Sequence, residues 1–594
     1  MASTEKAGYN RFLLLVAGLG GLLYGVDVGI IAGALPYLEA TSGLNAGQLS
    51  IIVAAVLLGS VISTLFAGVL ADWLGRRPLM VLSGLLFVCS IPVIALSHGY
   101  ESLVVGRLLQ GVSAGLIGVV VPLYLAECLA ATDRGKGTGI FQWLLTLGIV
   151  TAAVVGMYFS FRVEEVAKLG NAATIFAFKD KAWRSIFWVS LPPGILFVIG
   201  SLMVSESPRW LFRRGHRDAA YAALLRSRTK EQADVELAEM KQAAVAEKAR
   251  TSTGTQFKES LLRRKYVIPF VLACVILACN QATGVNSIIG YNTNILLQSG
   301  LSDVQAHWGY VLFTIVNFLM TIGGVLLVDR KGRKFLLSVG TAGIIVSLLC
   351  TGALFHLTEK LRVDSREALQ SMVGAGQKVA LLYDEKTAGT LLDASGDAGK
   401  AIRNRPTSLV VIYSYGDFRA ATKVARSDDT SATPIEITRE SCVPANKVVA
   451  FFSNPFSNLN AARSAPLQID NALITPVPTT HNGWLVAISL FVFMAFYAIG
   501  PGVCVWLALS ELMPTRIRSN GMSIALLLNQ AVSTTIAAIF LPTVGKHGYS
   551  TMFFAFAACT VLYFITAAVF LPETKGKTLE EIEAHFEGAT GRHS

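Results

Sequence analysis

Twelve apolar stretches alternate with shorter polar gaps along this chain, and each is close to the length needed to cross about 30 Å of hydrocarbon. A stretch of this length predicts a transmembrane helix rather than a strand or a short core helix. Six stretches lie before residue 205 and six lie after residue 266. The predicted helices cover residues 12–35, 49–70, 79–97, 101–125, 138–160, 186–204, 267–290, 308–328, 335–355, 484–507, 519–543 and 550–571.

Composition supports a multi-span membrane protein. Of the 594 residues, 53% are hydrophobic and 15% are charged, against roughly 25% charged in soluble domains. The first stretch lacks the cationic start and small-residue cleavage site of a signal peptide, so we expect a retained helix. The Lys and Arg residues of the short loops explain most of the net charge of +11, so no nucleic-acid partner is expected.

Those basic residues fall on one side of the predicted membrane. They include Arg76, Arg77, Arg134 and Arg518, and the positive-inside rule assigns their side, with both termini, to the cytoplasm. The opposite gaps at 36–48, 98–100 and 291–307 contain no Lys or Arg, although 161–185 contains several. The expected compartment is the plasma membrane, most naturally a bacterial inner membrane.

Three short motifs occur twice in the same order. Residues 72–77 (DWLGRR) recur as 329–334 (DRKGRK), and 205–207 (SES) recur as 572–574 (PET). The pair of Glu127 and Arg134 recurs, with the same spacing, as Glu511 and Arg518. Internal symmetry in a hydrophobic chain is typical of a transporter built from two halves around a midplane site.

The repeat also locates an insertion. Asp72 and Glu127 are 55 positions apart, whereas Asp329 and Glu511 are 182 apart, a difference of 127 residues. The extra residues lie at about 357–483, on the predicted outer side. Three runs in this segment, 378–384, 408–414 and 447–453, have strand character, with helix-compatible stretches between them. We expect a small α/β domain without an assigned function, and a partly disordered loop is the alternative.

The predicted organisation has five parts. Helices one to six lie in residues 1–204, and helices seven to nine lie in residues 267–356. Helices ten to twelve and a cytoplasmic tail lie in residues 484–594. Residues 205–266, rich in Ala, Glu, Lys and Leu, are expected to form cytoplasmic helices that join the halves. The fifth part is the 357–483 insertion.

Several motifs, in order across both halves, resemble those of the sugar porters of the major facilitator superfamily. The first half contributes residues 21–27 (GLLYGVD), 106–111 (GRLLQG), 122–127 (PLYLAE) and 206–209 (ESPR). The second half contributes residues 281–286 (QATGVN), 500–502 (GPG) and 572–576 (PETKG). The resemblance covers all of the chain except the insertion. It implies an all-α membrane protein of two six-helix bundles that gives alternating access to a monosaccharide site.

Asp27 lies inside the first predicted helix, where an ionisable side chain costs roughly 2.5–3.5 kcal/mol on insertion scales and marks a functional site by default. Arg107 is its expected partner. The resemblance implies proton coupling, because proton-coupled sugar porters have an acid here and facilitative relatives generally have a neutral residue. Burial favours the protonated acid and a nearby guanidinium favours the ionised one, so a changing separation would bind and release a proton. The alternative is a permanent pair that holds two helices together.

A sugar site needs amides for the hydroxyl groups and an aromatic face for the C–H surface. The resemblance supplies these at the residues expected to bind substrate, namely Gln142, Asn280, Gln281, Asn286, Asn317, Trp506 and Asn529. Buried amides in membrane helices also bond neighbouring helices, and this is the alternative, above all for Asn317 and Asn529.

Three positions depart from the family pattern. Asn280 replaces the first of two Gln residues, Gly290 precedes Tyr291 where two Tyr residues are usual, and Gln530 stands where many relatives have Trp. These changes make the expected pocket more polar on one side and less aromatic. They leave hexoses, pentoses and polyols such as inositol open as substrates.

The repeated charged motifs are expected to form a cytoplasmic gate. Acids facing Arg across helix ends can form ion pairs that exist only when the two bundles close together. The alternative is that the basic residues only set the topology. The gate candidates are Asp72, Arg76, Arg77, Glu127, Arg134, Glu206, Arg209, Asp329, Arg333, Glu511, Arg518 and Glu573.

No nucleophile constellation, phosphate-binding loop or metal-spaced His/Cys cluster stands out, so neither an enzyme nor a cofactor is expected. The expected partners are a sugar or polyol, a proton and membrane lipid, and an outer partner of the 357–483 domain is left open. The main hypothesis is a proton–sugar symporter. The alternatives are a facilitative uniporter and a non-transporting sugar sensor that uses the outer domain.

Overall fold

The computed structural model covers the whole chain. It describes residues 2–129, 134–169, 171–252, 264–374, 376–429, 434–444, 457–513 and 518–574, with the single residues 447, 450, 454, 582, 585 and 586. Twelve helices in this part are long and apolar enough to cross a membrane. The prediction of twelve transmembrane helices is confirmed.

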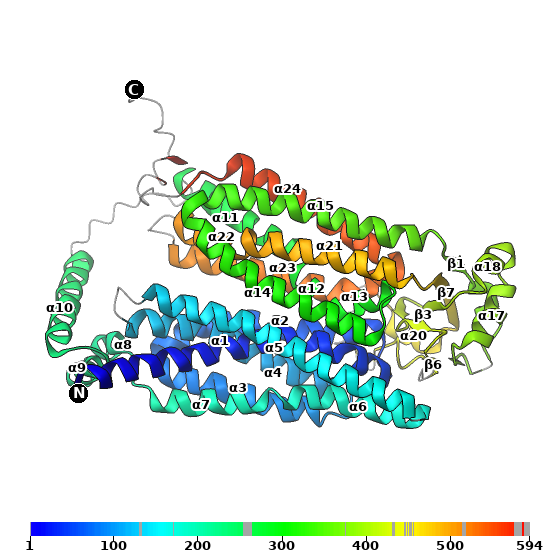
Figure 1. Cartoon of the computed structure of the whole chain (residues 1–594), viewed down its shortest axis with the longest axis horizontal. Helices are drawn as coiled ribbons and strands as arrows, with labels where there is room; N and C mark the ends of the chain where they lie inside the picture. Colours follow the sequence, from blue (N-terminus) through cyan, green and yellow to red (C-terminus); the bar gives the residue numbers. More distant parts are fainter. Residues whose placement is uncertain are drawn as a thin grey trace.

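The helices form two bundles that lie side by side (Figure 1). The first half consists of α1 (Ala2–Thr41), α2 (Ala46–Leu74), α3 (Arg76–Ala95), α4 (Tyr100–Cys128), α5 (Arg134–Leu169), α6 (Ala172–Trp188) and α7 (Leu191–Met203). Together α6 and α7 make the sixth candidate span, Ala172–Met203. The interval 161–185, interpreted from the sequence as a gap between spans, is helical except around residue 171, because α5 and α6 both extend through it.

The second half has the same number of candidate spans, and glycines break two of them. It consists of α11 (Arg264–Ala282), α12 (Val285–Gly290), α13 (Asn292–Gln298), α14 (Asp303–Lys331), α15 (Arg333–Glu359), α21 (Thr480–Ile499), α22 (Pro501–Leu512), α23 (Arg518–His547), α24 (Tyr549–Ile565) and the π-helical turn η1 (Thr566–Phe570). Gly284, with φ +81°, separates α11 from α12, and Gly500 separates α21 from α22 just before Pro501. Broken membrane helices are tolerated where protein or a water-filled cavity satisfies the freed backbone.

Three helices connect the halves at one end of the bundles: α8 (Pro208–Arg213), α9 (Arg217–Ser227) and α10 (Lys230–Ser252). This end, where α1 begins, is called the linker end. The opposite end is called the insertion end, because the segment between α15 and α21 lies there (Figure 1).

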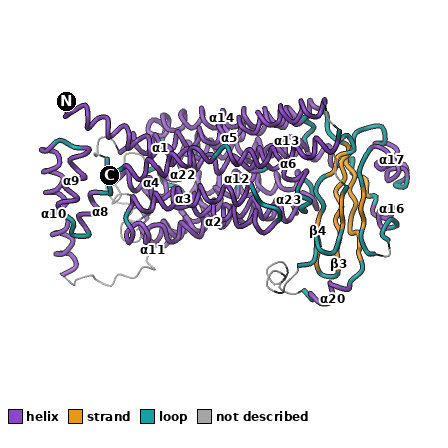
Figure 2. Tube along the Cα trace, turned by 90° about the horizontal axis from the view of Figure 1, so that it is seen from below, coloured by secondary structure: helices purple, strands orange, loops and turns teal. Residues whose placement is uncertain are grey.

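That segment forms a small domain around an antiparallel sheet, which lies at the right-hand end of the bundles in Figure 2. The sheet has the order β1–β7–β3–β4, with β5 also paired to β3, and β2 pairs with β6. The strands are β1 (Val363–Asp364), β2 (Val379–Leu381), β3 (Thr407–Tyr415), β4 (Phe418–Ala421), β5 (Ala425–Arg426), β6 (Ile435–Ile437) and β7 (Leu467–Pro476). The helices are α16 (Arg366–Gln370), α17 (Glu385–Asp393), α18 (Gly396–Ile402) and α20 (Leu459–Ser464).

The expected α/β insertion is therefore present, with differences in its strands. The predicted runs 378–384 and 408–414 contain β2 and β3. The third run, 447–453, lies largely outside the described residues, and its described positions 447 and 450 are helical. The longest partner of β3 is instead β7, which was not predicted and whose burial alternates less regularly than that of an amphipathic strand. Its mixed sequence, LQIDNALITP, gave no clear period of two.

The apolar core differs between the two ends. At the insertion end one continuous cluster joins both halves, including Tyr37 and Leu49 of the first half with Tyr291 and Phe540 of the second. At the linker end each half has its own cluster. Between the halves, α2 packs against α23 and α5 packs against α14. The described residues thus show two bundles that are closed together at the insertion end.

Candidate functional site

Asp27 on α1 and Arg107 on α4 face each other inside the first half. Asp27 Oδ1 lies 3.8 Å from Arg107 Nη1, and the two side chains are 1% and 2% exposed. Among the described residues neither Asp27 oxygen has a hydrogen-bond partner, whereas Arg107 Nη1 donates to Gln110 Oε1 at 2.6 Å. The structure brings the expected pair together, with an ionic contact but without a hydrogen bond. A carboxylate held this loosely in a low-dielectric interior responds strongly to a small change in its distance from the guanidinium.

Four polar side chains of the second half form one hydrogen-bonded network. Gln281 Nε2 donates to Asn529 Oδ1 at 3.2 Å. Asn286 Nδ2 donates to Gln281 Oε1 at 2.9 Å and to Ser533 Oγ at 2.8 Å. The network joins α11, α12 and α23, and it brings together three of the residues expected to bind substrate.

The break at Gly284 explains how this network forms. Gln281 and Asn286 lie on either side of it, so the chain turns from α11 into α12 between them. A Cβ on Gly284 would lie 2.3 Å from Phe556 Cε2, so only glycine fits both the space and the positive φ. The turn places two amides of one span around a single point rather than along one straight face.

Asn280 and Asn529 have further partners. Asn280 Nδ2 donates to Tyr497 Oη at 3.3 Å, while its Oδ1 has no partner among the described residues. Asn529 is fully buried, and its Nδ2 donates to the Leu277 backbone carbonyl at 3.0 Å. That contact ties α23 to α11, as the helix-bonding alternative for Asn529 requires.

Two further residues expected to bind substrate have no described contact with this network. Gln142 is exposed on α5 and Asn317 is half-buried on α14. The side chain of Trp506 on α22 lies outside the described residues.

Two residues that bond the expected amides, Ser533 and Tyr497, were missed from the sequence. Ser533 lies four residues after Asn529 and therefore on the same face of α23, a spacing that could have indicated it. Tyr497 lies three residues before Gly500, in the last turn of α21. Both signals depend on knowing which face of the helix points to α11.

The repeated charged motif caps a helix in each half. In the first half, Glu206 Oε1 accepts the backbone N–H groups of Arg76 and Arg77 at 3.0 and 3.2 Å. In the second, Glu573 accepts those of Arg333 and Lys334 at 3.0 and 3.2 Å. A carboxylate at a helix N-terminus satisfies free N–H groups and complements the helix dipole.

The buried Arg76 adds an ionic cluster within the first half. Its guanidinium contacts both oxygens of Glu127 at 2.9 Å and Asp72 Oδ1 at 2.9 Å. Its Nη1 donates to the Ala71 carbonyl at 2.9 Å, just as Arg333 Nη1 donates to the Val328 carbonyl at 3.3 Å. Arg77 Nη2 donates to the Leu202 carbonyl, and Arg209 is exposed.

These contacts differ from the expected gate, because each joins residues of one half only. At the linker end the described apolar clusters of the two halves are separate. The side chains of Arg134, Asp329, Glu511 and Arg518 lie outside the described residues. Ion pairs between the halves in another state stay a prediction.

Polar contacts do cross between the halves at the insertion end. Tyr37 Oη donates to Asp303 Oδ2 at 2.8 Å, and Asn294 Nδ2 donates to Glu39 Oε2 at 2.5 Å. Ser50 Oγ lies 3.3 Å from Tyr291 Oη and also accepts the Leu541 backbone N–H at 3.2 Å. Tyr37, Ser50, Tyr291 and Asn294 are buried, so these contacts stabilise the closed end.

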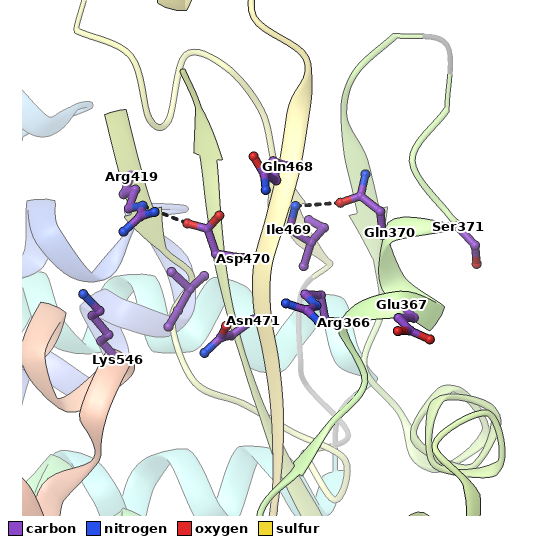
Figure 3. A pocket seen from close by; sticks show the side chains of 11 residues that line it. Arg366, Glu367, Gln370, Ser371, Arg419, Gln468, Ile469, Asp470, Asn471 and Lys546 are labelled. Atoms are coloured by element: carbon purple, nitrogen blue, oxygen red, sulfur yellow. Dashed lines mark hydrogen bonds and ion pairs between the residues drawn. The ribbon is translucent and has the colours of Figure 1, made fainter. Parts of the chain in front are cut away.

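The inserted domain borders a cavity of about 820 Å³ at its junction with α23 (Figure 3). Asp470 on β7 and Lys546 on α23 line it, and Arg419 Nε lies 3.0 Å from Asp470 Oδ2. None of the residues expected to bind substrate is among its described lining. It is a separate feature from the amide network.

Comparison with known proteins places these features in context. The family model described as "Sugar (and other) transporter" matches residues 13–374 and 471–586, so that the unmatched interval falls in the insertion. The glucose transporter GlcP of Staphylococcus epidermidis is 26% identical over 588 residues, 98% of each chain. The proton myo-inositol cotransporter of Homo sapiens is 26% identical over 593 residues, 98% of this chain and 83% of that one.

A solved structure shares the fold. The xylose transporter XylE of E. coli, in an inward-open conformation, aligns with a TM-score of 0.63 at 20% identity, covering 96% of this chain and 98% of that one.

Proposed function

Because this chain belongs to the sugar transporter family of the major facilitator superfamily, and is thus an integral multi-pass membrane protein for sugar transport, we propose that it is a proton-coupled symporter of a monosaccharide or polyol. Transport would proceed by alternating access, with the proton carried in the first half and the substrate bound mainly by the second.

The observation that carries the proton-coupling proposal is the state of Asp27. Its carboxyl group is 1% exposed and lies 3.8 Å from Arg107, without a hydrogen bond from the described residues. A purely structural pair would be expected to form two parallel hydrogen bonds, since Arg and a carboxylate match in shape. Asp27 instead leaves Arg107 bonded to Gln110, which suits a group that alternates between protonated and ionised forms.

The substrate site is proposed at the amide network. Gln281 and Asn286 combine donor and acceptor atoms around one point, and amides of this kind recognise pairs of sugar hydroxyls. Asn280 Oδ1, without a described partner, offers a further acceptor beside Tyr497. Gln142, Asn317 and Trp506 would complete the site from other helices when substrate is bound.

The substrate class is a hexose, a pentose or an inositol. The names of the similar proteins refer to glucose, xylose and myo-inositol, and these polyhydroxylated rings present the same kind of hydroxyl pairs. Asn280, shorter by one methylene than Gln, alters one hydrogen-bonding arm. A difference of about 1–3 kcal/mol per altered contact is enough to change the order of preference.

The orientation is proposed from the basic residues at the linker end. Arg76, Arg77, Arg330 and Lys331 lie at helix ends there, and the positive-inside rule places such residues in the cytoplasm. The insertion end then faces outward, as in a bacterial inner membrane, and the closed insertion end corresponds to an inward-facing state.

Proton uptake driven by sugar in proteoliposomes tests the proposal. Purified protein is screened with D-xylose, D-glucose and myo-inositol, and the external pH is recorded. Alkalinisation with one sugar supports symport and identifies the substrate. Asp27→Asn should abolish alkalinisation while sugar exchange across the membrane continues. The matched control is Asp397→Asn, because Asp397 is fully exposed on the inserted domain.

Two outcomes contradict the proposal. Sugar entry without proton movement in the unmodified protein would identify a uniporter, with Asp27 as a structural partner of Arg107. Full proton uptake in Asp27→Asn would remove this residue from the coupling mechanism.

A further inference from the structure

The inserted domain touches both halves of the transporter at the insertion end. It is part of the second half by covalent connection, since it joins α15 to α21, and its strands β3 and β4 pack against α23. It also reaches across to the first half, where β4 packs against α2. The domain therefore bridges the two bundles on the side where they are closed (Figure 2).

Glu39, in the last turn of α1, is where the three parts meet. Asn294 on α13 of the second half donates to its Oε2 at 2.5 Å. From the inserted domain, the Val424 backbone N–H donates a hydrogen bond to the same carboxylate, and the Lys423 ammonium attracts it electrostatically. One side chain of the first half thus has partners in both other parts.

Lys423 also caps the C-terminal end of α1. Its Nζ lies 3.4 Å from the Glu39 carbonyl and 3.5 Å from the Ala40 carbonyl. Those carbonyls belong to the free C-terminal end of the helix, which favours a cation. Burial lowers the pKa of Lys423 below its ordinary value, while the nearby Glu39 and Asp429 raise it. The ammonium is therefore partly desolvated, beside Glu39 of the first half and Asp429 of its own domain.

Two other contacts attach the domain to the first half at separate points. Asp429 lies 3.9 Å from Lys179 on α6. Asn45, which caps α2, donates through Nδ2 to the Ser441 carbonyl at 2.6 Å. On the other side, Arg426 Nη1 donates to the Leu297 carbonyl at the end of α13 in the second half.

Opening of the insertion end must break one set of these contacts. The ends of α1 and α13 have to separate for a substrate to enter, and one rigid domain cannot remain attached to both. Its connections to the second half are covalent, so the contacts of Lys423, Asp429 and Ser441 with the first half are the ones that release. We propose that the inserted domain is a third component of the gate at the insertion end. The domain stabilises the closed state by binding the outer ends of α1, α2 and α6.

This inference assumes that the halves move relative to each other, as the proposed transport function requires, but not that any particular sugar or proton is carried. A distance measurement without substrate therefore tests it separately. His98, between α3 and α4, and His481 on α21 are both exposed at the insertion end, one in each half. Both are replaced with Cys and spin-labelled in a background without the eight native cysteines, and their separation is measured by pulsed electron paramagnetic resonance in nanodiscs.

The variants follow from the geometry. Val363 on β1 pairs with Ile474 on β7, so residues 364–473 can be replaced by a short Gly-Ser linker without separating α15 from α21. Lys423→Ala removes the central contact while keeping the domain. Lys400→Ala is the matched control, because Lys400 is exposed on α18 and pairs only locally, with Asp397 at 3.2 Å.

The expected result is a single short distance in the unmodified protein and in Lys400→Ala. A second, longer distance should appear in Lys423→Ala, with an open-to-closed ratio raised about 3- to 10-fold, the scale of one charged contact. The increase in the open-to-closed ratio should be larger in the protein without the inserted domain. Unchanged distances in Lys423→Ala and in the excised protein overturn the inference, and Lys423→Ala decides alone if the excised protein does not fold.

The distance measurement and the proton-uptake assay can succeed or fail independently. A shifted distance in a protein that moves no sugar supports the gate and contradicts symport. Sugar-driven proton uptake together with unchanged distances supports symport and contradicts the proposed gating role of the inserted domain.

Discussion

The two halves of the transporter have kept the same device at the linker end and have diverged near the midplane. At the linker end, Gly75 and Gly332 have φ values of +103° and +87°, and each is followed by a helix that a distant Glu caps. A Cβ on either glycine would lie 2.4 Å from an oxygen of that Glu. The same sequence motif therefore builds the same turn twice.

Near the midplane the halves have different chemistry. The first half contains the buried charges of Asp27 and Arg107, whereas the second contains a network of neutral amides around Gln281 and Asn286. Charges suit a proton and amides suit hydroxyl groups. Duplication therefore preserved the turn that shapes each bundle, whereas the buried polar groups of the two halves have diverged.

The largest effect is expected for removing Arg107, because the stability of the first half depends on the buried pair that Arg107 forms with Asp27. Arg107→Met leaves the buried Asp27 without its counter-charge and should lower stability by about 3–5 kcal/mol. Thermal unfolding in detergent measures this. The double variant Arg107→Met/Asp27→Asn should recover most of the loss, and equal melting temperatures for the single and double variants would contradict a charge-specific role.

A smaller loss, equal in the two halves, is expected for the glycines of the repeated motif. Gly75→Ala and Gly332→Ala each force a side chain into a backbone region that only glycine adopts readily and against a carboxylate, at a cost of about 1–3 kcal/mol. Thermal unfolding compares them, with Gly68→Ala as control because a Cβ there meets nothing within 4 Å. If one half tolerates the change, the two turns are not equivalent.

The amide half should respond in affinity rather than in stability. Asn286→Ala removes two hydrogen-bonding partners from the network and should weaken sugar binding about tenfold or more. Isothermal titration with the transported sugar measures the Kd. Thr535→Ala, an exposed position on α23 that bonds only the Ala531 carbonyl in the described structure, serves as control. An unchanged Kd in Asn286→Ala would move the substrate site away from this network.

The smallest effect is expected for Asn529, whose bonds tie helices together. Asn529→Ala removes the contact with the Leu277 carbonyl and should cost about 0.6 kcal/mol of stability, the average for such bonds in membrane helices. Thermal unfolding and the sugar Kd are measured on the same sample. A Kd change as large as that of Asn286→Ala, with unaltered stability, would instead make Asn529 a direct substrate ligand.

Some of the site was accessible from the sequence because single residues carry a large physical signal. An acid within an apolar stretch identified Asp27, and Arg107 followed from the need for a partner. Ser533 and Tyr497 could not be found in this way, since a hydroxyl in a membrane helix costs little and its role depends on the neighbour it faces. The same applies to β7, whose place beside β3 depends on pairing across more than fifty residues.

The sequence by itself determined the twelve helices, the duplication and the position of the insertion, because length, apolarity and repeated motifs are local properties of the chain. It also placed a charge where hydrocarbon makes charge costly. Only the tertiary structure decided which end of the bundles is closed and that the repeated acids cap helices within each half. It alone brought Glu39, Asn294 and Lys423 together. Those contacts join residues more than 100 positions apart, and their geometry depends on how whole bundles pack, which no local pattern encodes.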